Sequence, residues 1–215
     1  MKASMLVAAF GVTFGAATAA SAQLVITEIW QGVSGPDHTG DWFELTNFGQ
    51  SAFDPTTLFF EDESADPVEA AQLMGITSIA SGESVIFVGG DMSDASLFEL
   101  VWNTGGNVQV GWHDGSGLGQ SGDAIFLFDS TLPGANTVAS QAFGETSDGQ
   151  SWFWNPVTMS WNNELSVAGQ FGAYESSFGP DTTFPAVGSP GVIPAPGAAS
   201  LFAIGAAGLL RRRRA

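Results

Sequence analysis

The chain from residue 23 to residue 191 is a series of short apolar runs separated by turn residues. β-branched and aromatic side chains recur between clusters of Gly, Pro, Asn and Asp, and we find no extended apolar repeat at helical spacing. This pattern predicts an all-β domain whose strands form a two-sheet sandwich. One short helix is expected at 68–74. The expected strands are 24–30, 41–47, 57–61, 84–88, 97–102, 107–112, 124–128, 137–143 and 151–154.

The alternation of apolar and polar positions is clearest in the second expected strand. Phe43 and Leu45 alternate there with Trp42, Glu44 and Thr46. Successive side chains of a strand point to opposite faces of its sheet. We therefore expect Phe43 and Leu45 to lie in the core and the other three side chains to form a polar and aromatic face.

The charge balance is strongly acidic and limits the classes of partner. The 22 Asp and Glu residues face five Lys and Arg residues, and no Lys or Arg lies between positions 3 and 210. Phosphate recognition and attraction to DNA depend on positive charge, so ordinary nucleic-acid binding is excluded. The sequence has no Cys, which also excludes disulfides, thiolate zinc sites and thiol nucleophiles.

Residues 1–22 have the features of a signal peptide. Lys2 precedes an apolar stretch over 5–15, and Ala20-Ser21-Ala22 fits the small-residue pattern of a cleavage site. A buried or membrane-spanning N-terminal helix is the alternative, but the apolar stretch is shorter than the roughly 20 residues that a span needs. We expect export of the protein and a mature chain that begins at Gln23.

Residues 192–215 predict a second targeting segment. A proline-containing motif at 194–197 leads into an apolar stretch at 198–210, which ends at the four arginines 211–214. As a helix this stretch is about 20 Å long, which is short for a bilayer core about 30 Å thick. The arginines favour a cytoplasmic end. The pattern indicates a short C-terminal apolar helix that anchors the chain transiently in the membrane, and a basic tail on a soluble protein is the alternative.

This C-terminal arrangement resembles the PEP-CTERM sorting tail of bacterial envelope and exopolysaccharide-associated proteins. Ala195 stands where the family motif has Glu between two prolines. The resemblance implies recognition and removal of the tail by exosortase-like sorting machinery. It also implies a location in the cell envelope, at the cell surface or outside the cell.

The body of the chain resembles the lamin-tail domain, because six segments occur in the order of that family. The resemblance implies an immunoglobulin-like sandwich that serves in adhesion, as a scaffold or in binding, without a shared catalytic motif. Long insertions at 61–74 and 157–184 depart from the compact version of the domain. The six segments are 24–29, 41–47, 79–88, 117–127, 149–152 and 188–191.

Clustered carboxylates in expected loops provide candidate calcium ligands, because Ca²⁺ takes oxygen ligands. The spacing of an EF-hand is missing, and a solvated acidic surface is the alternative interpretation. The candidates are Glu61, Asp62, Glu63 and Asp66, with Glu69 nearby and a further pair at Asp91 and Asp94.

Three tryptophans provide a candidate ligand-binding patch for a glycan or a partner protein. Trp152 and Trp154 alternate on one face of their expected strand, and Trp161 follows in the sequence. Large exposed aromatic clusters usually mark binding sites. Packing of these side chains in the core is the alternative.

The evidence for catalysis in the sequence is weaker. His113, Asp114, Ser116 and Ser121 contain the residue types of a nucleophilic triad, but neighbours in a Gly-rich turn rarely have that geometry. Two suitably separated carboxylates are enough for glycoside hydrolysis. A secreted, carboxylate-based hydrolase acting on polysaccharide therefore stays open as the alternative function.

These observations predict a signal peptide at 1–22, a lamin-tail-like β-sandwich at 23–191 and a sorting tail at 192–215. The expected function is that of an exported acidic module without catalysis, which binds or structures material at the cell surface or in the extracellular matrix. The expected partners are the sorting machinery, extracellular polysaccharide and other surface proteins, and calcium is the candidate cofactor.

Overall fold

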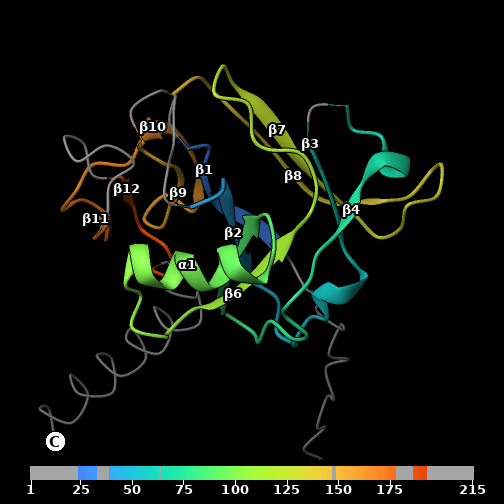
Figure 1. Ribbon diagram of the computed structural model, residues 1–215, viewed down its shortest axis with the longest axis horizontal. Coiled ribbons are helices and arrows are strands. Elements are labelled where there is room, and N and C mark those ends of the chain that lie inside the picture. The colour runs from blue at the N-terminus through green and yellow to red at the C-terminus, as the bar shows by residue number, and fades with distance from the viewer. Residues whose placement is uncertain (1–23, 33–38, 63, 147–148, 178–185, 193–215) are drawn as a thin grey trace, which may run out of the picture.

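The computed structural model describes residues 24–32, 39–62, 64–146, 149–177 and 186–192. These residues are mainly β, with twelve strands in three sheets, one α-helix and two short 3-10 helices (Figure 1). The predicted signal peptide, the proline-containing motif and the C-terminal apolar helix lie outside the described residues. Within the described residues, no helix is both long enough and apolar enough to cross a membrane.

The largest sheet has six strands in the order β10-β9-β1-β2-β5-β6. Neighbouring strands are antiparallel except β5 and β6, which are parallel because the helix α1 (Met92–Trp102) connects them. The strands are β1 (Leu24–Trp30), β2 (Trp42–Asn47), β5 (Ser84–Gly89), β6 (Gln109–His113), β9 (Trp152–Asn155) and β10 (Ser160–Leu165).

The second sheet has four antiparallel strands in the order β4-β3-β7-β8, and the third is the pair β11-β12. The 3-10 helices η1 (Pro55–Thr57) and η2 (Pro67–Glu69) flank β3. The strands are β3 (Phe59–Asp62), β4 (Ala71–Gln72), β7 (Asp123–Phe128), β8 (Thr137–Phe143), β11 (Tyr174–Glu175) and β12 (Val187–Gly188).

The main hydrophobic core lies between the six-stranded and the four-stranded sheets. Phe43 and Leu45 of β2 are fully buried in it, as their alternation predicts. Phe43 stacks on Phe60 of β3 with ring centroids 5.6 Å apart, so the core joins the two sheets directly. The expected mainly β architecture with more than one sheet is confirmed, and the pair β11-β12 is a third sheet beside the two that share this core.

A second core lies on the opposite face of the six-stranded sheet, where α1 covers it (Figure 1). Trp30 and Trp42 from the sheet pack against Trp102 from the helix, with ring centroids between Trp42 and Trp102 5.2 Å apart. All three indole rings are almost completely buried. The face that the alternation predicted to be polar and aromatic is therefore an interior face.

The expected strand at 97–102 is wrong, because these residues form the second half of α1. Asp91 caps the helix by accepting a hydrogen bond from the Ser93 amide, and the Asp91 amide donates one to the Asp94 carboxylate. Ala95, Phe98 and Trp102 are buried at helical spacing. Further apolar residues lie between these three, so the composition of the segment is also typical of a strand, which explains the wrong prediction.

The expected helix at 68–74 is also wrong. Only η2 forms there, because Asp66 caps one turn that starts at Pro67, and the chain then enters the short strand β4. Val68 is 55% exposed, so one side chain of the supposed apolar face has nothing to pack against. The other expected strands are present, with ends shifted by one or two residues in most cases.

Candidate functional site

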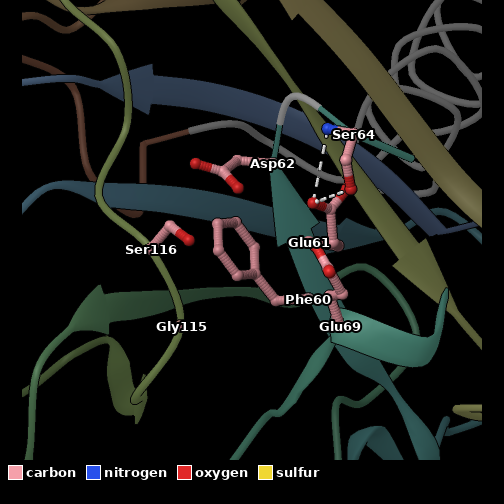
Figure 2. A pocket seen from close by; sticks show the side chains of 7 residues that line it. All are labelled: Phe60, Glu61, Asp62, Ser64, Glu69, Gly115 and Ser116. Atoms are coloured by element: carbon pink, nitrogen blue, oxygen red, sulfur yellow. Dashed lines mark hydrogen bonds between the residues drawn. The ribbon is translucent and has the colours of Figure 1, made fainter. Parts of the chain in front are cut away.

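An acidic pocket lies beside the end of β3 and has a volume of about 290 Å³ (Figure 2). Strand β3, the helix η2 and the loop that follows β6 bring its lining together. Gly115 permits the close approach of this loop, because a Cβ atom there would lie 2.9 Å from the Phe60 ring. The lining residues are Phe60, Glu61, Asp62, Ser64, Glu69, Gly115 and Ser116.

Glu61 is the most buried acid of this pocket, with 6% of its surface exposed. Its Oε1 accepts hydrogen bonds from the Ser64 amide at 3.3 Å and from the Ser64 hydroxyl at 2.6 Å. Its Oε2 is buried and accepts no hydrogen bond. A buried carboxylate oxygen without a donor is costly, so a positively charged ligand would stabilise this atom.

Asp62 leaves β3 on the opposite side from Glu61 and points toward the loop that carries Ser116 (Figure 2). Burial raises the pKa of Asp62 above its usual value, and the negative charges of Asp123 and Glu61 raise it further. A hydrogen bond from Ser116 has the opposite effect. The polar side chains of this lining are carboxylates and hydroxyls, and none of them carries a positive charge.

The structure brings together part of the predicted calcium ligands. Glu61 and Asp62 line the pocket with Glu69, whereas Asp66 accepts a hydrogen bond from the Val68 amide at 3.0 Å and caps η2. Glu63 lies outside the described residues. No group of three or more His, Cys, Asp or Glu side chains in the described ranges is placed to hold a metal ion directly. Calcium binding stays a prediction.

Ser116 is, with Ser64, one of the polar pocket residues that sequence reasoning did not select as ligands. It follows β6, more than fifty positions after Glu61, and only the packing of two sheets brings the two segments together. No local spacing in the sequence could reveal this proximity.

A pair of buried carboxyl groups, Glu28 and Glu44, forms a second site on the face of the larger sheet that α1 covers. The two residues lie directly opposite each other on β1 and β2. A β-bulge at Thr27 turns Thr27 and Glu28 to the same face. Both glutamates are 0% exposed, and the described residues contain no Lys or Arg that could neutralise them.

Neutral donors surround this pair. Glu44 Oε1 accepts a hydrogen bond from the Thr27 hydroxyl at 2.6 Å. Glu28 Oε1 accepts one from the Ser151 hydroxyl at 2.5 Å. Residues near the end of the described chain supply further donors, because the Ser189 amide donates to Glu28 Oε1 and the Gly191 amide donates to Glu44 Oε2, both at 2.6 Å.

The environment of the pair favours protonation. Burial raises the pKa of Glu28 to about 8, and the charge of Glu44 contributes to this shift. Burial also raises the pKa of Glu44 to about 7, against the effect of its hydrogen bonds. Sequence reasoning missed Glu28 and placed Glu44 on a polar face. The sequence did contain a sign of their burial, because each acid lies within a strand rich in apolar residues, Leu24–Trp30 for Glu28 and Trp42–Asn47 for Glu44.

The three tryptophans of the predicted aromatic patch lie together on β9 and β10. Trp161 is directly opposite Trp154, and Trp152 lies on the same face as Trp154. All three are partly buried, and Trp152 and Trp161 pack against the main core. The Nε1 atoms of Trp152 and Trp154 are buried and donate no hydrogen bond. Packing uses much of this surface, and ligand binding by it stays a prediction.

His113 occupies a core position at the end of β6. Its ring lies 3.9 Å from the ring of Phe60, between centroids, and it is 2% exposed. Burial lowers the pKa of His113 to about 4, so the side chain is neutral at pH 7. Asp114 and Ser116, which follow it in the sequence, are exposed.

Comparison of the chain with protein-family models, curated proteins and solved structures finds no match.

Proposed function

We propose that this protein is an exported acidic module without catalysis, which binds cations and anchors or structures extracellular material at the cell surface. The observation that carries the proposal is the acidic pocket beside β3, where a buried oxygen of Glu61 has no donor. Acceptors line the pocket, and no Lys or Arg in residues 3–210 competes for them. Such a lining favours a positively charged ligand.

Calcium is the ligand that we propose for the pocket. Ca²⁺ takes six to eight oxygen ligands and accepts water among them. The volume of about 290 Å³ exceeds what a bare ion needs, so an ion held by Glu61 and completed by water fits its size. A bound divalent ion would also allow this acidic surface to contact anionic polysaccharide, which its own charge would repel.

The finer features of the fold and location belong to the same proposal. The order of the six segments at 24–191 supports a lamin-tail-like, immunoglobulin-like sandwich as the displayed body. The two ends support export by a signal peptide and transient anchoring by a tail that exosortase-like machinery removes. The mass of the protein recovered from the envelope and the medium tests this part. A species that retains the arginines at 211–214 would contradict removal of the tail.

A secreted carboxylate-based hydrolase is the competing function, and the pair Glu28 and Glu44 favours it by chemistry. Raised carboxyl pKa values are typical of general acids. However, both side chains are completely buried, and residues 186–191 cover them. A polysaccharide needs an open cleft to reach such groups. We therefore prefer the binding function.

Isothermal titration of the full chain with calcium tests the proposed function. We expect one saturable site whose affinity falls about tenfold or more in Glu61→Gln, because the substitution removes a charged ligand. Glu145→Gln, which removes an exposed carboxylate elsewhere, is the matched control and should bind as the unchanged protein does. Equal weakening by both substitutions, or equal heats with sodium, would show that only the overall charge attracts the ion.

A further inference from the structure

The last described segment of the chain, residues 186–192, closes over the buried carboxyl pair. We call it the closing segment. The Ser189 amide and hydroxyl donate to the two oxygens of Glu28, at 2.6 Å and 3.0 Å. The Gly191 amide donates to Glu44. The carboxyl pair therefore accepts hydrogen bonds that hold this segment to the sheet.

Backbone hydrogen bonds and packing also fix the closing segment. The Val187 amide donates to the Gly149 carbonyl at 2.8 Å, and the Ser151 amide donates to the Val187 carbonyl at 3.0 Å. The short pair β11-β12 adds two residue pairs, Tyr174 with Gly188 and Glu175 with Val187, and the Ser176 amide donates to the Ala186 carbonyl at 2.8 Å. Gly188 packs so closely that a Cβ atom there would lie 2.9 Å from Glu28 Oε1. The segment thus seals the carboxyl groups from water, although it is not part of either large sheet.

The electrostatic surroundings of the pair contain only acids. The elements packed on this face carry the further titratable groups Tyr174 and Glu175 of β11 and Asp94 and Glu99 of α1. Burial raises the pKa of Tyr174, and the charges of Glu28, Glu99 and Glu44 raise it further. No described cation offsets a negative charge here. One ionised glutamate can use the neutral donors around it, but a second buried charge directly opposite adds repulsion in a medium of low dielectric constant.

We propose that Glu28 and Glu44 form a proton-dependent latch that keeps the closing segment in place while at least one of them is protonated, and releases it when both are ionised. Release of this segment hydrates both carboxylates without breaking a strand of the two large sheets. The latch makes the exposure of the closing segment depend on pH, and it is independent of calcium binding at the pocket.

Hydrogen exchange of the full chain, followed by mass spectrometry at pH 6 and pH 9 and corrected for intrinsic exchange rates, tests the latch. We expect protection of peptides covering 186–192 to fall about tenfold or more at pH 9, since one unit of pKa corresponds to a factor of ten. Peptides from β7 and β8 should keep their protection. An equal loss in those strands would mean global unfolding, and an unchanged closing segment would mean no latch. Either result overturns the proposal.

Two substitutions make the test specific. In Glu28→Gln/Glu44→Gln no carboxyl group can ionise, so protection of the closing segment should not depend on pH. Glu44→Gln alone preserves both Ser189 contacts and leaves one acid, so its loss of protection should be smaller than in the unchanged protein. This single variant replaces the double variant in the test if the double variant does not fold. Glu145→Gln, at an exposed position outside both sites, is the control and should lose protection as the unchanged protein does. A full loss in Glu44→Gln would contradict the paired mechanism.

Discussion

At the scale of single residues, burial decides the state of the titratable side chains more than neighbouring charge does. Burial is the largest cause of the pKa shifts of Glu28, Glu44 and His113, although the first two move up and the third moves down. The sequence identifies each of these residues as ionisable but does not show its burial. Glu44 illustrates the difficulty, since its alternation with Phe43 was predicted correctly and its exposure was not.

His113 should weaken the fold in acid. Its pKa is about 4 in the folded chain, below the ordinary value of 6.5, so between these pH values the unfolded chain binds the extra proton. The free energy of unfolding therefore falls as pH decreases through this range. His113→Phe preserves an aromatic ring beside Phe60 and removes the proton site. Relative to the unchanged protein, the variant should gain roughly 2 kcal/mol between pH 7 and pH 4.5 in urea unfolding. An equal acid loss in both proteins would contradict this role.

At the scale of elements, strands with turn residues at both ends were predicted well, whereas short apolar segments were not. The strands Leu24–Trp30 and Thr137–Phe143 match their predicted bounds. Met92–Trp102 was missed because Leu97 and Leu100 stay exposed and blur its apolar face. Its capping residues were visible in the sequence, but we interpreted Asp91 and Asp94 as metal ligands.

Asp91→Ala should weaken α1 and the second core that it covers. The substitution removes the hydrogen bond from the Ser93 amide, at 2.7 Å, and leaves that donor at the helix start without its cap. Loss of such a cap costs about 1 kcal/mol of unfolding free energy. Urea unfolding at pH 7 measures the loss, and Glu145→Ala, at an exposed position outside α1, is the matched control. A loss of the same size in the control would mean that the cap contributes nothing.

At the scale of the whole molecule, the sequence predicted a mainly β fold, an acidic surface and three acids of the pocket, but not the buried pair or the loop that completes the pocket. The acidic pocket joins β3 to a loop after β6, and the buried pair joins β1, β2 and residues near the end of the described chain. Both depend on contacts between segments far apart in the sequence. Local patterns can indicate the strands, but the pairing and packing of those strands decide which acids meet.

The surface carboxylates and the buried pair Glu28 and Glu44 should affect stability differently when the salt concentration changes. Surface carboxylates repel one another across a chain with no Lys or Arg between positions 3 and 210. Raising NaCl from 10 mM to 150 mM shortens the screening length from about 30 Å to about 8 Å. At pH 6 we expect the melting temperature to rise by about 2–4 °C, which corresponds to roughly 1 kcal/mol for a chain of this size.

Salt should not remove the loss of stability above neutral pH, because Glu28 and Glu44 are buried and ions cannot screen them. Their pKa values in the fold, about 8 and about 7, exceed the ordinary value of 4.5. The folded chain therefore holds more protons between pH 4.5 and pH 8, and its unfolding free energy falls as pH rises through that window. The decrease in melting temperature from pH 6 to pH 9 should be similar at both salt concentrations and absent in Glu28→Gln/Glu44→Gln. If 150 mM salt abolished the decrease in the unchanged protein, surface repulsion and not the buried pair would be its source.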